Sequence, residues 1–438
     1  MAQPIAERQS AVLVGVQTPA VSDEDHAAHL AELGRLVRTL GYDPVATLTQ
    51  RRPGTGSATV LGSGKLKALA ELTGGPGVVA SGAAVRTSRA RERWAAEAAE
   101  EAAEEAEEAA EEAEAAEEEA TEGPAAAPAL PPGVRPTVVV VDHELSPSQL
   151  RNLEKATGVT VLDRTGVIVD IFHRHARSRE ARLQVEMARL KYLAPRLRES
   201  AGRSERQAGR GAGDTAVELD RRRIRDRLAE LGEELAVVQQ AQDQRRHARR
   251  DQLRVALVGY TNAGKSSLMR ALTGSEVLVA DQLFATLDTT VRALHPASRP
   301  RVLVSDTVGF IRKLPHDLVA SFRSTLDEAL EASLLLTVVD ASDPTFEAQL
   351  EVTRAVLREI GADQVPGRLL LNKADRLDAA ARRELQARFP EAILLSAKVP
   401  GDVAGLRQVV LDFFEGQFVE ADLVIPYCLL YTSPSPRD

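Results

Sequence analysis

The sequence contains a single cysteine, Cys428, among its 438 residues. No disulfide can therefore form within the chain, which suits a reducing compartment. Long apolar runs are also missing, since VVVV at 138–141 and LLL at 334–336 are far too short to cross a bilayer. The first ten residues, MAQPIAERQS, lack the basic and then apolar profile of a signal peptide. We expect a cytoplasmic protein without a membrane span.

Basic residues are missing from residues 97–122, which contain 14 glutamates mixed almost entirely with alanine. Without these glutamates the net charge of −9 would become +5, so an acidic segment interrupts a mildly basic chain. The whole Glu/Ala run, at about 90–132, consists of good helix formers but has no apolar stripe to bury. It predicts a solvated insert without chemistry.

Strand and helix patterns alternate in the first part of the chain. Residues 11–17 (AVLVGVQ) and 134–142 (VRPTVVVVD) predict buried strands, and residues 26–40 predict a helix. A second helix follows, with a serine at its start and a glycine at its end, and the β-branched residues 159–172 then predict another strand. We therefore expect a small parallel α/β domain over residues 1–175, interrupted by the Glu/Ala run.

Two apolar stripes at helical spacing come next. Their members are Leu183, Met187, Leu190, Ala194 and Leu197 in the first segment, and Ile224, Leu228, Leu231, Leu235 and Val238 in the second. They predict an antiparallel helical hairpin over 176–250. Residues 198–214 at its tip are rich in Gly, Arg and Ser and cannot pack as a core. Segments 220–227 and 244–250 add basic faces, for which solvated surfaces carrying ion pairs are the alternative to nucleic-acid contacts.

From Leu253 onward the alternation of strands and helices is regular. It predicts a domain with a mostly parallel sheet over residues 251–417. The motifs that carry chemistry in this part of the chain stand at the ends of strands, where ligands bind in such folds.

The motif GYTNAGKS at 259–266 joins a strand to a helix, which is the context that a phosphate-binding P-loop requires. Gly259 and Gly264 let backbone N–H groups wrap the phosphates. Lys265 reaches the β- and γ-phosphates, and Ser266 offers its hydroxyl to Mg²⁺.

A second glycine-rich stretch, LGSGKLKAL at 61–69, is similar to a P-loop at first sight. Leu66 follows its lysine where the motif needs serine or threonine, and Thr59 stands where the first glycine belongs. The stretch therefore predicts a turn followed by a helix.

The motif DTVGF at 306–310 ends another strand. Asp306 would hold Mg²⁺ through water, and the N–H of Gly309 would sense the γ-phosphate. Phe310 stands where Ras-like switches place a glutamine, and a phenyl ring cannot orient water by hydrogen bonding. Because Lys265, Mg²⁺ and backbone donors supply most of the catalysis, we expect slow turnover that a partner raises.

The motifs NKAD and SAK predict the base. Asp375 can accept two hydrogen bonds from the N1–H and the 2-amino group of guanine, whereas adenine offers neither donor. Asn372 would brace the loop and touch N7, and the Lys373 stem would lie along the base. The N–H of Ala397 can meet the guanine O6. These residues predict GTP and GDP as ligands.

A switch segment is expected between the P-loop and DTVGF. In DQLFATLDTT, at 281–290, a threonine hydroxyl and carbonyl can close over Mg²⁺ and the γ-phosphate. Thr286, Thr289 and Thr290 all compete for this role on chemistry alone.

The order GYTNAGKS, FATLD, DTVGF, NKAD, SAK resembles the translation-factor-related GTPases, and in particular the HflX family of ribosome-associated GTPases. The likeness covers about residues 11–75 and 134–425. It implies a GTPase that binds the large ribosomal subunit and its RNA and splits or rescues stalled or idle ribosomes. It also implies that Thr286 is the magnesium-binding switch threonine. Phe310 fits a group of GTPases with a hydrophobic residue in place of the catalytic glutamine.

The resemblance implies a nucleotide site built from five segments. Its members are Gly259, Tyr260, Thr261, Asn262, Ala263, Gly264, Lys265, Ser266, Ser267, Phe284, Ala285, Thr286, Leu287, Asp288, Asp306, Thr307, Val308, Gly309, Asn372, Lys373, Ala374, Asp375, Ser396, Ala397 and Lys398. Ser266 and Thr286 would bind Mg²⁺, and Lys265 and Gly309 would be catalytic. Some relatives with an asparagine matching Asn262 use K⁺, so a K⁺ site and simple bracing of the loop both stay open for this residue.

The chain departs from the family pattern in three places, one of which is the Glu/Ala run, because it has no counterpart in the family. At the hairpin tip Ala212 and Asp214 replace the proline and glutamate of a Gly-Pro-Gly-Glu-Thr signature, and Thr289 follows FATLD where proline is common. Residues 418–438 are expected to be a remnant of a C-terminal domain, with 428–438 (CLLYTSPSPRD) non-native.

Two other functions stay open. One is a regulatory switch that acts on a protein effector without RNA. The other is a tRNA-modification GTPase, whose G domain is similar but whose chain ends in a Cys-x-Gly-Lys signature, unlike CLLY here. We expect the chain to be a monomer.

Overall fold

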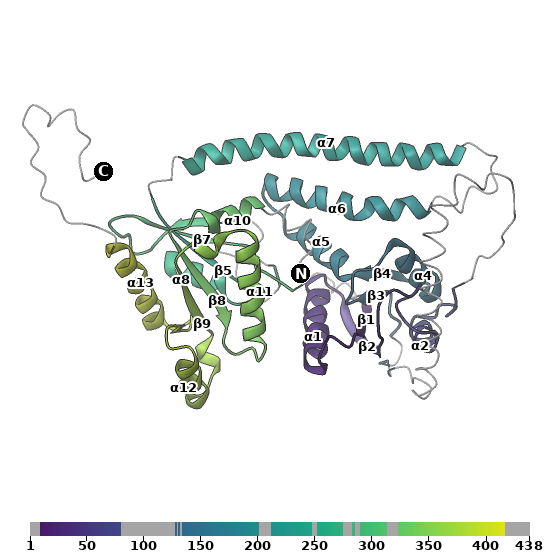
Figure 1. Cartoon of the computed structure of the whole chain (residues 1–438), viewed down its shortest axis with the longest axis horizontal. Helices are drawn as coiled ribbons and strands as arrows, with labels where there is room; N and C mark the ends of the chain where they lie inside the picture. Colours follow the sequence, from purple (N-terminus) through teal and green to yellow (C-terminus); the bar gives the residue numbers. More distant parts are fainter. Residues whose placement is uncertain are drawn as a thin grey trace, which may run out of the picture.

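The structure, a computed structural model, has two α/β units joined by a pair of long helices (Figure 1). It describes residues 9–79, 128, 130–131, 134–200, 212–247, 252–274, 283–284, 290–312 and 323–416. Most of the Glu/Ala run, residues 201–211 of the predicted hairpin tip at 198–214, and the C-terminal residues 417–438 lie outside this part. Within the described ranges, none of the helices is long and apolar enough to cross a membrane.

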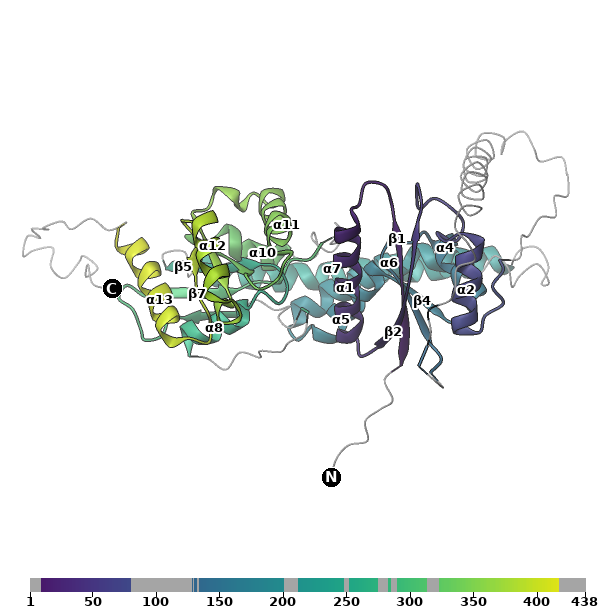
Figure 2. The same ribbon diagram turned by 90° about the horizontal axis from the view of Figure 1, so that it is seen from below.

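The N-terminal unit is built on four parallel strands in the order β2-β1-β3-β4. These are β1 (Ser10–Gln17), β2 (Asp43–Arg51), β3 (Val138–Val141) and β4 (Thr160–Asp163). Successive side chains of β1 and β3 enter two different cores, because neighbouring residues of a strand point to opposite faces. One face is covered by α1 (Asp23–Thr39) and α5 (Arg164–His175), and the other by α2 (Ser63–Thr73) and α4 (Pro147–Thr157) (Figure 2). Helix α2 follows a turn, as the stretch at 61–69 predicts.

The strand predicted over 159–172 is wrong beyond Asp163, because residues 164–172 are helical. The side chain of Asp163 accepts a hydrogen bond from the N–H of Gly166 at 2.7 Å and so caps the helix. Apolar residues at helical spacing, among them Ile168, are buried against the sheet. Burial of this helical face outweighs the β-propensity of its branched side chains.

The predicted hairpin consists of α6 (Arg179–Ser200) and α7 (Ala212–His247), which lie side by side and antiparallel (Figure 1). Leu183 of α6 and Leu231 of α7 are buried, and the other stripe residues with described side chains are partly buried. Arg227 pairs with Glu186 at 2.9 Å across the exposed edge of the hairpin. A second face of α6 packs on α5, so the hairpin is joined to the N-terminal unit.

The C-terminal unit has six strands in the order β10-β9-β8-β5-β7-β6. They are β5 (Leu253–Gly259), β6 (Thr290–Ala293), β7 (Val302–Asp306), β8 (Leu334–Asp340), β9 (Gly367–Asn372) and β10 (Ile393–Leu394). All are parallel except β6, which runs antiparallel to β7. This is the mixed α/β fold that the sequence predicts.

Helices cover both faces of this sheet. On one face lie α8 (Lys265–Thr273) and α13 (Pro400–Glu415), and on the other α10 (Arg323–Leu330) and α11 (Phe346–Glu359), with α12 (Ala379–Arg388) beside α11. Strands β2 and β6 were not predicted. Both are edge strands with few buried side chains, so their hydrophobic pattern is weak.

Candidate functional site

The loop between β5 and α8 has a backbone that only glycine permits at two positions. Gly259 has φ of 145° and Gly264 has φ of 96°. A Cβ on Gly259 would lie 2.1 Å from the carbonyl oxygen of Val338, and one on Gly264 would lie 2.3 Å from Nδ2 of Asn372. The loop can therefore curl tightly over the start of α8, where the helix dipole favours an anion.

Lys265, the first residue of α8, is buried inside this loop, with 6% of its surface exposed. Its Nζ donates to the carbonyl oxygens of Gly259 at 3.0 Å and Tyr260 at 2.8 Å. Burial lowers the pKa of Lys265 to about 8, although the nearby negative charge of Asp306 opposes the shift. Without a ligand, the site thus holds a buried ammonium group, and an anion bound beside it would stabilise its charge.

Ser266 and Asp306 meet at the ends of the P-loop and β7. The Ser266 Oγ donates to Oδ2 of Asp306 at 2.8 Å, and Asp306 is fully buried. The neighbouring Thr307 Oγ1 donates to the carbonyl of Leu257 at 2.7 Å and so joins β7 to β5. A hydroxyl oxygen beside a carboxylate oxygen is a donor set that suits a hard divalent cation such as Mg²⁺.

Phe310 packs in the core, with 2% of its surface exposed, in a cluster that includes Ala329 of α10. Its N–H donates to the carbonyl of Gly259 at 3.0 Å, which joins this segment to the P-loop. A Cβ on the preceding Gly309 would lie 3.1 Å from Nζ of Lys265, so the two loops approach closely there. The hydrophobic side chain at position 310 therefore belongs to the core rather than to the surface of the phosphate site.

Asn372 connects the phosphate loop with the predicted base loop. Its Nδ2 donates to the carbonyl of Ala263 at 2.9 Å, and its Oδ1 accepts from the N–H of Ala397 at 3.2 Å. The residue is 1% exposed, so both bonds are shielded from water. The structure thus places Asn372 as a brace, and it gives the Ala397 N–H a partner within the protein instead of leaving it directed only at a base.

Lys373 adds a second link between these loops. Its Nζ donates to the carbonyl of Asn262 at 2.7 Å and pairs with Asp340 at 2.6 Å. Asp340 was not among the predicted site residues. Its signal in the sequence is its place at the end of an apolar strand, β8, just as Asp306 ends β7.

Asp375 lies at the outer side of the base loop, with 27% of its side chain exposed. Its Oδ1 accepts from the Ser396 hydroxyl at 2.7 Å, and its Oδ2 pairs with Nζ of Lys398 at 3.2 Å. These donors, Ser396 first, lower the pKa of Asp375, so the carboxylate is ionised at neutral pH. An ionised carboxylate only accepts hydrogen bonds, which suits a ligand edge made of donors.

Within the predicted switch segment at 281–290, the structure describes Leu283, Phe284 and Thr290, which begins β6. Ala285, Thr286, Leu287, Asp288 and Thr289 lie outside the described residues. The Phe284 ring is 2% exposed and packs edge-on against Phe172 of α5, with ring centroids 4.6 Å apart. The structure therefore places Phe284 against the N-terminal unit. The remaining predicted residues, Thr261, Ser267, Val308 and Ala374, lie on the loops already described or on α8.

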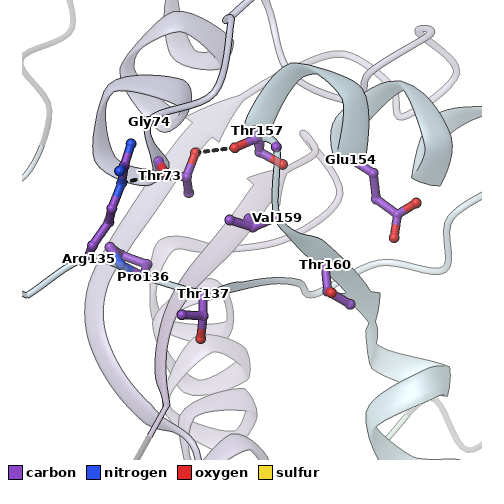
Figure 3. A pocket seen from close by; sticks show the side chains of 10 residues that line it. Thr73, Gly74, Arg135, Pro136, Thr137, Glu154, Thr157, Val159 and Thr160 are labelled. Atoms are coloured by element: carbon purple, nitrogen blue, oxygen red, sulfur yellow. Dashed lines mark hydrogen bonds between the residues drawn. The ribbon is translucent and has the colours of Figure 1, made fainter.

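A second hollow lies in the N-terminal unit, away from these loops (Figure 3). Arg135 donates through Nε to the Thr73 carbonyl at 3.0 Å, and the Thr73 hydroxyl donates to the Thr157 carbonyl at 2.8 Å. The hollow adjoins the amino ends of β3 and β4, whereas ligands of parallel α/β sheets bind at the carboxyl ends. We assign no function to it.

The class of protein follows from the carboxyl edge of the C-terminal sheet. A glycine-shaped phosphate loop with a buried lysine stands beside an ionised carboxylate that fits the two donors of guanine. Together with the six-stranded α/β fold, this defines a P-loop GTPase.

Comparisons with known proteins identify the family. Three family models match successive parts of the chain: "GTP-binding GTPase N-terminal" at 27–85 and 129–173, "GTP-binding GTPase Middle Region" at 175–249, and "50S ribosome-binding GTPase" at 254–373. GTPase HflX of Gluconacetobacter diazotrophicus is 67% identical over 419 residues, which cover 95% of this chain and 88% of that protein. GTPase HflX of Escherichia coli is 43% identical over 298 residues, 66% of this chain and 70% of that protein. The chain belongs to the HflX family of GTPases.

Among solved structures, a GTP-binding protein of the archaeon Sulfolobus solfataricus in complex with GDP is similar over 94% of this chain and 100% of that one. The TM-score is 0.44 and the identity 21%. A likeness of this size carries no argument about the present chain, whose family rests on the relatives above.

The buried Lys265 makes nucleotide binding depend on pH. Phosphates bound beside the ammonium raise its lowered pKa, so above pH 8 binding requires uptake of a proton. We expect the affinity for GDP to weaken about fourfold between pH 7 and pH 8.5. Calorimetry in two buffers with different ionisation enthalpies measures both the affinity and the proton uptake. A constant affinity over this range, with no proton uptake, would contradict the expectation.

Proposed function

We propose that this GTPase acts on the large ribosomal subunit in the cytoplasm, where it splits or rescues stalled or idle ribosomes. Membership of the HflX family supports the proposal, as does the match of residues 254–373 to the model described as "50S ribosome-binding GTPase". We also propose a monomer with an N-terminal domain at 1–175, a helical hairpin at 176–250 and a GTPase domain at 251–417.

For phosphate binding, we assign the P-loop N–H groups to the α- and β-phosphates and Lys265 to the β- and γ-phosphates. The N–H of Gly309 would contact the γ-phosphate. Ser266 and Thr286 would bind Mg²⁺, with Asp306 acting through water. When bound, Mg²⁺ neutralises charge that develops on the phosphate oxygens.

For hydrolysis, the proposal uses positioning and electrostatics rather than a side-chain base. Phe310 is buried in the core, so residue 310 offers no group to orient the attacking water. Lys265 stabilises the charge on the phosphates, and turnover of the protein alone is slow. A ribosomal contact that orders the segment around Thr286 or holds the water would raise the rate.

For base selection, Asp375 would accept hydrogen bonds from guanine, with Ser396 and Lys398 holding its carboxylate. For Asn262, a K⁺ site and bracing of the loop both stay open, because the bond that it accepts from Lys373 at 2.7 Å goes to its main-chain carbonyl and does not involve its side chain. We propose Mg²⁺ as the cofactor and do not route the reaction through K⁺.

The RNA contact is assigned to the Gly/Arg-rich hairpin tip rather than to the helix faces. In the 220–227 segment, Arg222 pairs with Asp226 at 4.0 Å and Arg223 with Asp220 at 3.1 Å, on exposed surface. A solvated helix face would carry such ion pairs, so they favour a solvated surface over nucleic-acid contacts for this segment. The tip sequence, most of which lies outside the described residues, combines arginines with glycines and has more basic than acidic residues over 198–214, which suits phosphate contacts.

Co-sedimentation with ribosomes tests the proposal. With a non-hydrolysable GTP analogue at a stated salt concentration, we expect the protein to pellet with the large subunit, and added large subunits to raise GTP turnover at least tenfold. Deleting residues 201–211 should abolish both effects and leave GDP affinity unchanged. Equal turnover with and without subunits, and no pelleting, would contradict the proposal. Pelleting with tRNA instead would favour the tRNA-modification alternative.

A further inference from the structure

A buried polar bridge connects the P-loop to the N-terminal unit. The hydroxyl of Tyr260, the second residue of the P-loop motif, donates to Glu32 of α1 and accepts from the N–H of Arg312 at 3.0 Å. Tyr260 is 3% exposed and Glu32 is 4% exposed. Burial and the adjacent carboxylate raise the pKa of Tyr260, so its hydroxyl stays protonated and donates at every physiological pH.

Arg164 of α5 holds Glu32 in place. Its guanidinium forms an ion pair with Glu32, donates to Asp142 at 2.7 Å, and reaches the carbonyl of Arg312 at 3.3 Å. All three charged side chains are nearly inaccessible to water. Removing one member of such a buried network leaves the others poorly satisfied, so the bridge is a rigid connection.

Tyr260 links this bridge to the catalytic lysine. While its side chain contacts Glu32, its own carbonyl oxygen accepts the Nζ of Lys265 at 2.8 Å. Arg312, which also bonds the Tyr260 hydroxyl, stands three residues after Gly309. One residue of the P-loop is therefore fixed by the N-terminal unit, by the lysine and by the segment that follows the predicted γ-phosphate sensor.

Apolar contacts surround the bridge. A single buried cluster joins α1 and α5 of the N-terminal unit to three segments of the C-terminal unit. The residues from those segments are Tyr260, Leu283, Phe284, Val308 and Ile311. Water is excluded around the polar groups, which strengthens their hydrogen bonds.

We propose that Glu32, although it belongs to the N-terminal unit, is a positioning residue for the GTPase reaction. Held by Arg164, it fixes the Tyr260 side chain. The Tyr260 carbonyl in turn fixes the ammonium of Lys265 where the phosphates bind. A GTPase domain without this contact retains every phosphate-binding residue but holds its lysine and P-loop less firmly. A small misplacement of a catalytic group lowers turnover strongly. Loss of the contact therefore lowers kcat for GTP more than it weakens the binding of GDP.

Steady-state kinetics of the full chain with Glu32→Gln, Tyr260→Phe and the double variant tests this assignment. Each single variant is expected to lower kcat for GTP about tenfold, with GDP affinity changed less than about threefold. The double variant should lose no more than either single variant, because both weaken the same connection: Glu32→Gln removes the charge that pairs with Arg164, and Tyr260→Phe removes the hydroxyl. Arg35→Ala is the matched control: Arg35 lies one turn further along α1 and contacts Asp343 across the same boundary at 3.9 Å. It should leave kcat unchanged.

Three results would overturn the assignment. They are a kcat within twofold of the unaltered protein in Tyr260→Phe, a higher kcat in either single variant, and additive losses in the double variant. If Glu32→Gln fails to fold, Tyr260→Phe alone decides, since it removes one hydroxyl and leaves the Arg164 ion pairs intact. A purely structural role would lower the thermal midpoint and leave kcat of the folded fraction unchanged, which also counts against the proposal.

Discussion

Replacing Lys265 with alanine is expected to lower GTP turnover by about three orders of magnitude or more while the protein stays folded. The ammonium lies inside the P-loop, held by the carbonyls of Gly259 and Tyr260, so it is already in place when phosphates arrive. Burial in the free protein lowers its pKa, which shows that the unliganded site tolerates the charge at a cost. Removing the side chain therefore removes the charge that acts on the phosphates, and it also removes the two hydrogen bonds to the carbonyls of Gly259 and Tyr260.

Single-turnover phosphate release, with nucleotide affinity and the thermal midpoint measured in parallel, tests this expectation. Arg270→Ala is a suitable control, because Arg270 is a cation near the end of the same helix and is exposed to solvent. It should retain full turnover. A Lys265→Ala variant with turnover within tenfold of the unaltered protein would show that the charge on the phosphates is stabilised elsewhere.

Asp375→Asn is expected to change the base that the protein selects. The carboxylate accepts hydrogen bonds only, whereas the asparagine amide also donates, so the donors of guanine lose a partner and the 2-oxo group of xanthine gains one. We expect GDP affinity to fall about 10²- to 10³-fold and XDP to bind better than GDP. Titration with fluorescent GDP and XDP measures both effects.

The neighbouring Asp378→Asn variant controls for the loss of a charge in this region. Asp378 caps α12 through bonds to the N–H groups of Ala380 and Ala381, a role that asparagine also fills. It should leave the preference for GDP intact. A GDP preference that persists in Asp375→Asn would mean that the base is selected by other groups.

The sequence predicted most of the fold because its apolar patterns are strong where elements are buried. β5, β7 and β8 lie inside the sheet and are almost wholly buried, and their runs of valine and leucine are evident. The edge strands β2 and β6 have few buried side chains and gave no such pattern. The strand predicted over α5 was wrong for another reason. Its branched residues favour strands locally, and only packing on the sheet stabilises the helix.

Apart from Phe284, the predicted site residues with described positions converge at one edge of the sheet, since parallel strands bring their carboxyl ends together. Motif spacing alone could not reveal Asp340 as the partner of Lys373, because Asp340 ends β8 whereas Lys373 follows β9. Nor could it show that the ring of Phe310 enters the core. Such pairings depend on the register of neighbouring strands and on which way a chain turns after each of them.

The sequence by itself determined that this chain has a P-loop, a guanine-type base motif and the order of segments of the HflX family, because each of these depends on residues close together along the chain. Only the tertiary structure decided that Glu32, Arg164 and Tyr260 meet. These residues are separated by more than a hundred positions from Glu32 to Arg164 and by nearly a hundred from Arg164 to Tyr260. No local pattern signals such a contact, because it exists only once two separately folded sheets dock and exclude water between them.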